Sequence, residues 1–416
     1  MVRIMIKKAF LFPGQGSQYV GMGKKLCETY EVARRTFEEA DDALSFDLSG
    51  LCFHGDPTEL TLTKNAQPAI LTTGVAMFRV LQEKKIQPDY LAGHSLGEIT
   101  ALTCADAISF ADAVRLAQRR GEFMQAAVPT GAGAMAAVMT RDVEMLKELC
   151  EKVSGEELVV ISNFNTRTQQ VISGNVNAVN RAIAQLTEAD IKTKLLNVSA
   201  PFHCPLMKPA AERFREELKQ YTLRDPKYPV IANVDAKPYE GAASIAERLT
   251  NQIVLPVRWA ESMTYLKKSM VQYCAEVGAG HVLKNMMRTN ISDIPVFSFE
   301  SDEDALYAYA EKCRFPFVSR AMGIVVATKN NNWDDAAYQA GVIAPYNELA
   351  KLQARIEQEE RKATAEEMDR TVELLLTIFA TKKTPAEEQI DRLRELFADT
   401  GEEEYFAAFD YGRIHV

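Results

Sequence analysis

The sequence of 416 residues lacks the features that define several protein classes. No apolar run approaches the roughly 18 residues of a membrane span, and the strongest, Leu374 to Ala380, fits the buried face of a helix. The net charge of -9 argues against a nucleic-acid-binding protein, which needs clustered lysine and arginine. Arg3, Lys7 and Lys8 leave no apolar core for a signal peptide. We therefore expect a cytoplasmic protein without a membrane or a nucleic acid as its partner.

Cysteine and histidine are sparse as well. The seven cysteines are an odd number and form no Cys-x-x-Cys pair, which favours free thiols in a reducing compartment over a disulfide framework or a zinc site. We expect no structural metal. Only five histidines are present, so few residues can serve as a general base near neutral pH.

Strand-like and helix-like segments alternate along the first part of the chain. The apolar run Ala9 to Phe12 leads into the loop Pro13 to Gly16, which is the pattern of a buried strand. Residues 30–44 and 69–82 carry apolar side chains at three- and four-residue spacing, which predicts helices. This alternation predicts an α/β fold around a parallel sheet. The length of the chain suits two or three domains.

A different pattern occupies residues 134–199. One helix is expected after the first strand of this segment and another after the third, and the strands are expected at residues 134–139, 158–161, 170–173 and 193–198. This β-α-β-β-α-β order predicts a ferredoxin-like subdomain inserted in the main body. Further strands are expected at 230–232 and 273–277. We therefore predict a body made of residues 1–133 and 200–300, with the insert between them.

Residues 301–416 are predicted to form a helical C-terminal extension. A loop is expected at 330–332 and a long amphipathic helix at 344–362, in which the charged run 357–362 fits a solvated face. Two interpretations of the extension stay open: helices that pack on the body, or a module that docks a partner.

Two threonines are expected to begin helices within this extension. Thr364 is followed three residues later by Glu367, and Thr384 is followed in the same way by Glu387. In this pattern the threonine caps the helix and the glutamate reaches back to it. We therefore predict folded helices after both threonines.

The run Gly93-His94-Ser95-Leu96-Gly97 follows an extended segment and places a serine between two glycines. This is the pattern of a nucleophile elbow, a sharp turn from a strand into a helix. The strained backbone of such a turn requires neighbours without bulky side chains. The pattern predicts Ser95 as a covalent nucleophile for acyl transfer; the alternative is a glycine-rich turn whose serine only caps a helix.

Three motifs, in this order along the chain, resemble those of malonyl-CoA:acyl carrier protein transacylases. They are Phe12-Pro13-Gly14-Gln15-Gly16-Ser17-Gln18, Asn65-Ala66-Gln67-Pro68-Ala69 and Gly93-His94-Ser95-Leu96-Gly97-Glu98. The similarity continues through residues 120–125, 200–203 and 252–259 and covers about residues 9–290. With its extension the chain resembles the stand-alone, trans-acting enzymes of hybrid polyketide and lipopeptide pathways. The resemblance implies an α/β-hydrolase-like parallel-sheet body with the ferredoxin-like insert.

A serine hydroxyl needs a base within hydrogen-bond reach, and histidine titrates in the required range. His54, His281 and His415 lie in loop-like or terminal positions, and the His94 side chain is expected to point elsewhere on the turn. This leaves His203. Its local sequence alone favours a structural role, whereas the resemblance implies that it is the catalytic base.

No acidic residue stands out as the third member of a triad. The resemblance implies instead that the main-chain carbonyl of Gln252 orients His203; a polar residue at the end of a strand or helix is the alternative for this glutamine. Negative charge on the thioester oxygen also needs backbone N–H donors. The geometry of the turn gives Leu96 as one donor, and the resemblance implies Gln15 as the other.

The resemblance also implies residues that select the substrate. A planar guanidinium can hold the free carboxylate of malonyl by two hydrogen bonds, a role that falls to Arg120; the alternative is a basic helix face shared with Arg119. Phe202 matches the malonyl-selective form of its motif, so we expect methylmalonyl to be disfavoured. Asn163 and Asn165 correspond to residues near the acyl or carrier site, although asparagines at strand ends are often turn formers.

The favoured hypothesis is a ping-pong acyltransferase. Ser95 takes malonyl from malonyl-CoA, and the phosphopantetheine thiol of an acyl carrier protein accepts it, which supplies extender units for polyketide or fatty-acid biosynthesis. No metal or redox cofactor is expected. Two alternatives stay open: an editing hydrolase on the same scaffold, which as the resemblance implies would lack the arginine, and a non-catalytic docking subunit of a synthase.

Overall fold

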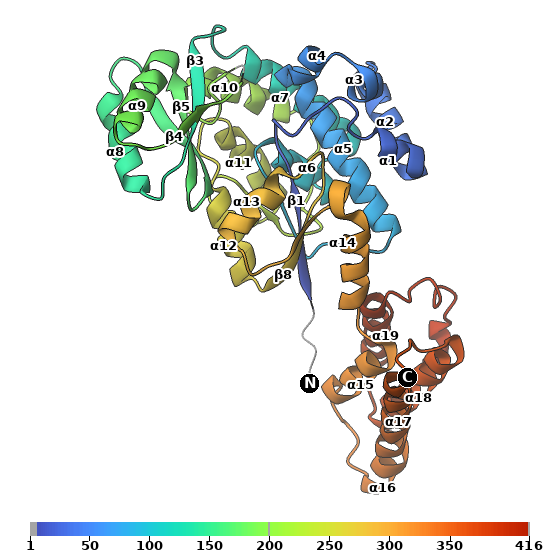
Figure 1. Ribbon diagram of the computed structural model, residues 1–416. Coiled ribbons are helices and arrows are strands. Elements are labelled where there is room, and N and C mark those ends of the chain that lie inside the picture. Colours follow the sequence, from blue (N-terminus) through green and yellow to red (C-terminus); the bar gives the residue numbers. More distant parts are fainter. Residues whose placement is uncertain (1–5, 199, 415–416) are drawn as a thin grey trace. The chain divides into compact units, whose positions relative to one another are not determined.

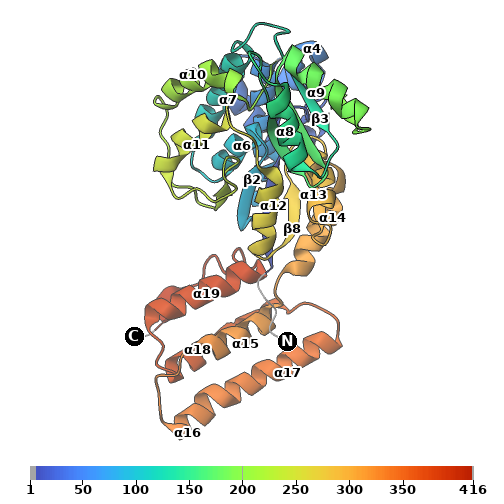
Figure 2. The same ribbon diagram turned by 90° about the vertical axis from the view of Figure 1, so that its left-hand side faces the viewer.

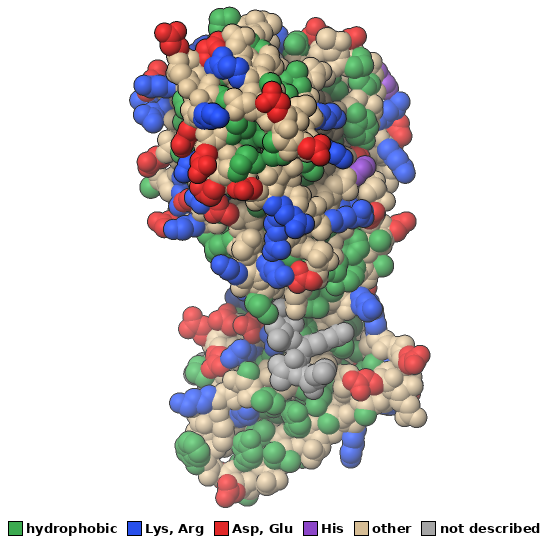
Figure 3. Space-filling model, turned by 60° about the vertical axis from the view of Figure 1, so that its left-hand side comes forward, with side chains coloured by type: hydrophobic (Ala, Val, Ile, Leu, Met, Phe, Trp, Pro, Cys, Tyr) green, Lys and Arg blue, Asp and Glu red, His purple; other side chains and the backbone are tan. Residues whose placement is uncertain are grey.

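The strand predicted at the start of the chain is the centre of a parallel sheet. The computed structural model describes residues 6–198 and 200–414, so residues 1–5, 199 and 415–416 lie outside this description. The chain divides into two units, a body of residues 6–307 and a C-terminal unit that begins at Ala308 (Figure 1). No helix among the described residues is long and apolar enough to cross a bilayer. On the face drawn in Figure 3, acidic and basic side chains are interspersed.

Five strands form the sheet of the body. They are β1 (Lys7–Phe12), β2 (Tyr90–Gly93), β7 (Val230–Ile231), β8 (Val271–Glu276) and β9 (Val296–Ser298). The strand order is β7-β2-β1-β8-β9, and every pair is parallel. The carboxyl ends of β1 and β2 therefore lie at the same edge, where parallel α/β sheets place their ligand sites.

Helices cover both faces of this sheet. Those of the body are α1 (Lys24–Thr29), α2 (Glu31–Leu44), α3 (Leu48–His54), α4 (Pro57–Thr61), α5 (Thr63–Glu83), α6 (Leu96–Cys104), α7 (Phe110–Gln125), α10 (Lys208–Leu218), α11 (Ile245–Gln252), α12 (Trp259–Lys268), α13 (Val282–Asn290) and α14 (Phe299–Cys313). Side chains alternate along β1: Phe10 and Phe12 meet Phe78 of α5, whereas Ala9 and Leu11 join the core under α12 and α13. Figure 2 shows α12 and α13 beside β8. Because helices bury both faces of the strand, its sequence is a continuous apolar run.

The inserted segment forms a second, antiparallel sheet. Its strands are β3 (Gly133–Val138), β4 (Val159–Thr166), β5 (Gln169–Asn175) and β6 (Thr193–Leu195), and its helices are α8 (Val143–Val153) and α9 (Val176–Glu188). The strand order is β4-β5-β3-β6, which is the ferredoxin-like arrangement. The predicted α/β fold with a separate antiparallel subdomain is thus confirmed. The N–H of Phe164 donates to Val257 O at 2.9 Å and joins the insert to the body.

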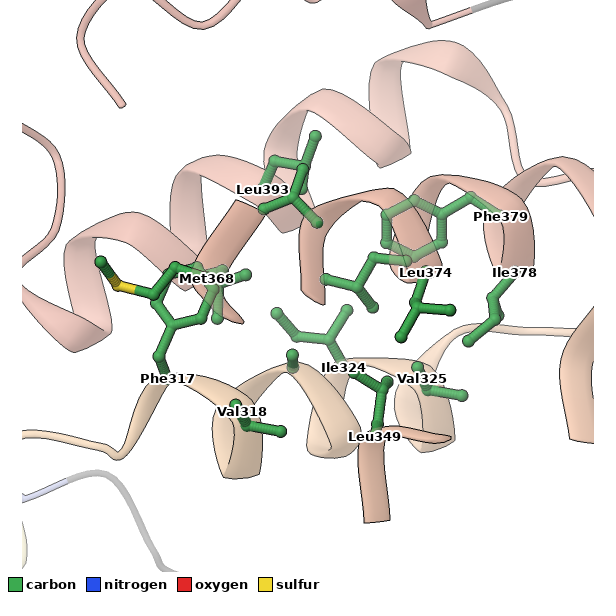
Figure 4. Close-up of a cluster of buried hydrophobic side chains, with 14 of the residues drawn as sticks. Phe317, Val318, Ile324, Val325, Leu349, Met368, Leu374, Ile378, Phe379 and Leu393 are labelled. Atoms are coloured by element: carbon green, nitrogen blue, oxygen red, sulfur yellow. The ribbon is translucent and has the colours of Figure 1, made fainter. Parts of the chain in front are cut away.

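The C-terminal unit is helical and has its own core. It contains α15 (Phe317–Ala327), α16 (Asp335–Tyr338), α17 (Ala344–Gln358), α18 (Ala365–Thr381) and α19 (Ala386–Thr400), with a π-helical turn at Gln339–Ile343 between α16 and α17. Phe317, Leu349, Leu374 and Phe379 belong to one buried cluster (Figure 4). The division from the body falls after Tyr307, inside α14, whereas the sequence placed it after residue 300. Continuous helix across this point explains the absence of a local signal.

The two predicted helix caps have different outcomes. The Thr364 hydroxyl accepts the N–H of Glu367, whose side chain accepts the N–H of Thr364, as expected. The prediction for Thr384 is wrong, because α19 begins one residue later with Pro385 as its N-cap. Within the described part of the chain, the buried Thr384 hydroxyl has no hydrogen-bond partner.

The amphipathic helix predicted at 344–362 also ends early, at Gln358. The charged run after it is only partly a solvated face, because Arg361 forms ion pairs with Glu359 and Glu367. The loop between α17 and α18, which contains Arg361, is therefore held by an ion pair to Glu367, the capping glutamate of α18. Glu367 thus belongs to both the cap and the ion-pair cluster.

We predict that Thr364→Ala lowers the local stability of α18 by about 1 kcal/mol, because it removes the acceptor of the first helical turn. Thr384→Val should have little effect or should stabilise, because it replaces a buried hydroxyl that lacks a partner. Native-state hydrogen exchange of the α18 and α19 amides in the full chain measures both. Equal losses of protection in the two variants would contradict the assignment of the caps.

Candidate active site

Ser95 lies on the turn between β2 and α6, with φ 54° and ψ -108°. A non-glycine residue in such a sparsely populated region costs about 1–3 kcal/mol and persists only where its surroundings hold it. A Cβ atom on Gly97 would lie 2.0 Å from the carbonyl oxygen of Phe12, so only glycine fits there. Asn233 holds the turn: its Oδ1 accepts the N–H of Ser95 at 2.8 Å, and its Nδ2 donates to Gly93 O at 2.7 Å.

The Ser95 hydroxyl is hydrogen-bonded to His203. The Oγ to Nε2 distance is 2.7 Å, and Nδ1 of the same ring lies 2.7 Å from the main-chain oxygen of Gln252. Because a carbonyl only accepts, Nδ1 carries the proton and Nε2 is left to accept the serine O–H. Burial, aided by the positive charge of Arg120, lowers the pKa of His203 to about 3, so the ring is neutral near pH 7.

Arg120 of α7 is buried beneath the serine, with 1% of its surface exposed. Its Nη1 donates to Gln67 Oε1 at 2.8 Å, and its Nη2 donates to Gln252 Oε1 at 2.7 Å and to Ser95 Oγ at 3.2 Å. Burial lowers the pKa of Arg120 to about 10, so the guanidinium stays charged. Among the described residues its Nε–H has no partner, which leaves donor capacity for an anion.

A buried glutamate, Glu98, lies behind these groups. Its carboxylate accepts Gln252 Nε2 at 2.6 Å, the N–H of Asn233 at 3.0 Å and the O–H of Tyr239. Burial raises its pKa to about 7, and the bonds from Tyr239 and Gln252 oppose that rise. Glu98 and Gln67 have no predicted role, although both stand in the motifs that resemble the family. No local pattern in the sequence marks Asn233.

The two expected oxyanion donors lie next to Ser95. Leu96 is the first residue of α6, and Gln15 belongs to the loop after β1. The side chain of Gln15 donates to Thr63 Oγ1 at 3.2 Å. Among hydrogen bonds between described residues, none uses the main-chain N–H of Leu96 or of Gln15. Both donors are therefore available to an incoming oxygen.

A cavity of about 310 Å³ opens above these groups. From the body it is lined by Gln15, Ser95, Arg120, Phe202 and His203, and from the insert by apolar side chains such as Met135 and Val171 together with Asn163 and Asn165. Most of the predicted site residues thus meet in one cavity. Leu96 and Gln252 do not line it, but Leu96 directly follows Ser95 and Gln252 bonds both Arg120 and His203.

The remaining candidates are placed as follows. His94 bonds Asn165 rather than Ser95, with Nε2 to Oδ1 at 2.9 Å, although its ring lines the same cavity. His54 ends α3, His281 precedes α13, and His415 lies outside the described residues. Arg119 pairs with Glu122 and Glu217 away from the cavity.

Two further groups can be assessed from burial and spacing. Burial raises the pKa of the Cys204 thiol, which disfavours the nucleophilic thiolate. In the described ranges, no group of three or more histidine, cysteine, aspartate or glutamate side chains is arranged to hold a metal ion.

Comparison with known proteins connects this geometry to a family. Residues 9–298 match the acyl transferase domain. A Bacillus subtilis protein named malonyl CoA-acyl carrier protein transacylase is 40% identical over 396 residues, which cover 93% of this chain and 99% of that protein. A match of this length includes the C-terminal unit. A second protein of that name, from Bacillus subtilis strain 168, is 48% identical over 68% of this chain and 90% of its own length.

Solved structures share the fold of the body. The crystal structure of FabD from Acinetobacter baumannii superposes with a TM-score of 0.71 and 43% identity, covering 73% of this chain and 98% of that one. PlMCAT, solved with the type II PKS acyl-carrier protein AntF, gives a TM-score of 0.69 and 40% identity over 70% of this chain and 95% of the matched one. By sequence and by fold, the chain belongs to the family of malonyl-CoA:acyl carrier protein transacylases.

Proposed function

We propose that this chain transfers a malonyl group from malonyl-CoA to the phosphopantetheine thiol of an acyl carrier protein. The observation that carries the proposal is a serine–histidine pair that shares one cavity with a buried, charged arginine. The pair supplies the nucleophile and base of acyl transfer, and the arginine supplies the counter-charge for a substrate that ends in a carboxylate.

In the first half-reaction, Ser95 Oγ attacks the thioester carbonyl while His203 Nε2 takes the hydroxyl proton. The charge that develops on the carbonyl oxygen is met by the N–H groups of Leu96 and Gln15. The C–S bond then breaks, and His203 returns the proton to the departing thiolate of coenzyme A. Malonyl is left as an ester on Ser95.

The second half-reaction reverses these roles. The pantetheine thiol gives its proton to His203, and the sulfur attacks the ester carbonyl. The bond from that carbon to Ser95 Oγ breaks, and the proton returns to the serine. Because base and donors come from the chain itself, these steps require no redox cofactor or metal. Apolar side chains of the insert limit access of water to the ester.

Arg120 is proposed to bind the malonyl carboxylate, and Phe202 to narrow the space beside the α-carbon. Phe202 lines the cavity and is itself buried. A contact of this kind is worth about 1–3 kcal/mol against an added methyl group. Asn165 is proposed to help bind the substrate as part of the cavity wall, where its side chain is hydrogen-bonded to His94.

The relatives support proposals for the acceptor of the malonyl group and for the pathway. Curated proteins of this name and the PlMCAT:AntF complex support an acyl carrier protein as acceptor, in fatty-acid or polyketide biosynthesis. We place the reaction in the cytoplasm; no disulfide joins the cysteines of the described residues, in keeping with a reducing compartment. We assign catalysis to residues 1–300, insert included, and keep 301–416 as an accessory helical unit.

Mass spectrometry of the intact protein tests the proposal. Malonyl-CoA should load one malonyl group on the wild-type chain and none on Ser95→Ala, and a holo acyl carrier protein should discharge it with gain of the same mass on the carrier. Release of free malonate faster than loading of the carrier would favour an editing hydrolase. Absence of any adduct would favour a non-catalytic docking subunit.

Arg120→Ala is predicted to reduce acylation by malonyl-CoA about 10- to 100-fold relative to acetyl-CoA, because a charge-assisted hydrogen bond is worth about 1.5–3 kcal/mol. Arg120→Lys keeps the charge without the planar fork and should retain an intermediate preference. Rates of Ser95 acylation by the two thioesters give the ratio. An unchanged ratio in Arg120→Ala would contradict the role of the guanidinium.

His203 is predicted to remain neutral, with its proton on Nδ1, from pH 8 down to pH 5. Its pKa in the folded chain, about 3, lies below the unfolded value of about 6.5, so the unfolded state binds more protons between these values. His203 therefore contributes stability that is complete above about pH 6.5 and is lost as the pH falls toward 3. Nitrogen-15 NMR of labelled histidine, assigned with His203→Asn, reports tautomer and titration. A titration midpoint of the His203 ring near pH 6.5 would contradict the lowered pKa.

A further inference from the structure

Glu98 is a fully buried carboxylate that the proposed reaction does not use. It lies on α6, one turn after Ser95, and contacts neither the serine hydroxyl nor the cavity. A buried carboxylate is strongly unfavourable unless donors and an opposite charge compensate it. Three donors surround Glu98, and its electrostatic partner is Arg120, which it does not touch.

The side chain of Gln252 bridges the glutamate and the arginine. Its Nε2 donates to Glu98 Oε2 at 2.6 Å and to Ser95 O at 2.9 Å, and its Oε1 accepts Arg120 Nη2 at 2.7 Å. One amide therefore meets an anion at its donor end and a cation at its acceptor end. The main-chain oxygen of the same residue holds His203.

This arrangement permits only one orientation of the amide. If the group turned by 180°, its oxygen would face the carboxylate of Glu98 and its NH₂ would face the guanidinium of Arg120. With Glu98 ionised, both contacts would be repulsive, because an anion offers no proton and a guanidinium offers no acceptor. Glu98 and the main-chain oxygen of Ser95, which both accept from Nε2, thus fix which end of Gln252 reaches Arg120.

We propose that Glu98 is a positioning residue for substrate selection: by orienting the Gln252 amide, it holds the Arg120 guanidinium where the malonyl carboxylate must bind. The proposal rests on the proposed function. Glu98 acts through Gln252 and Arg120 and makes no contact with the substrate.

A purely structural role is the alternative, since Glu98 also joins α6 to Asn233 and Tyr239. Glu276 provides a matched control in the same body. It is fully buried, its pKa is likewise raised to about 7 by burial, and its carboxylate accepts the N–H groups of Leu283 and Lys284 at the start of α13. It has no bond to Gln252 or Arg120.

The test compares Glu98→Gln with Glu276→Gln in the full chain. A glutamine at position 98 keeps the volume but offers only one acceptor oxygen. The measured quantity is the ratio of the rate constants for Ser95 acylation by malonyl-CoA and by acetyl-CoA. We expect Glu98→Gln to lower this ratio about 10-fold or more, because the charge-assisted bond that orients Gln252 is lost. Glu276→Gln should leave the ratio unchanged.

Coupling to Arg120 separates positioning from structure. In an Arg120→Ala background, Glu98→Gln should produce no further loss of the ratio, because the residue through which it acts is gone. An unchanged ratio in Glu98→Gln, an equal loss in Glu276→Gln, or a further full loss in the Arg120→Ala background would each overturn the proposal.

Two additional measurements keep the result interpretable. If Glu98→Gln does not fold, Gln252→Met removes the amide and retains the main-chain oxygen that holds His203; it should lower the ratio in the same way, and an unchanged ratio would overturn the proposal. The wild-type and Arg120→Ala ratios report separately on the proposed function. A wild-type chain that prefers malonyl through Arg120 while Glu98→Gln keeps that preference would disprove only the role of Glu98.

Discussion

For the proposed function, the guanidinium of Arg120 must remain charged while it is buried next to Ser95, and its neighbours meet that requirement. Moving a charge from water into the protein costs several kcal/mol unless polar partners replace the water. Gln67 and Gln252 supply amide oxygens that accept from Arg120. Glu98, which is bonded to the other end of the Gln252 amide, supplies the opposite charge. The helices α5, α6, α7 and α11 each contribute one member of this set. Burial keeps the cation free of competing water, so that a carboxylate can gain from binding it.

The nucleophile and base belong to the same network. Gln252 bonds Arg120 with its side chain and His203 with its main chain, so in the proposed reaction one residue at the end of α11 contacts both the group that binds the substrate and the group that transfers the proton. The positive charge also lowers the pKa of His203, which keeps the ring neutral and able to accept the Ser95 proton. The proposed function therefore links selection of an acidic substrate to activation of the serine.

The local parts of this arrangement could be predicted from the sequence. The turn at Ser95 follows from glycines that no other residue can replace, and the order of apolar runs predicts a parallel sheet and a ferredoxin-like insert. The strand order of the body sheet and the strand β9 were not predicted. Distant partners could not be found in this way. Arg120 and Gln252 are 132 residues apart, and Gln252 and Glu98 are 154 apart, so no local pattern joins them. The roles of His203 and Gln252 were predicted from the family resemblance. The cap predicted at Thr384 is wrong by one residue, because Pro385 is the N-cap of α19.

The structure of the malonyl-enzyme intermediate tests the central claim most directly. A crystal of the wild-type chain loaded on Ser95 by malonyl-CoA, in the absence of an acyl carrier protein, would show where the free carboxylate lies. The account predicts two hydrogen bonds from the Arg120 guanidinium to that carboxylate, with the ester oxygen toward the N–H groups of Leu96 and Gln15. A carboxylate that points into solvent and accepts no hydrogen bond from Arg120 would contradict it.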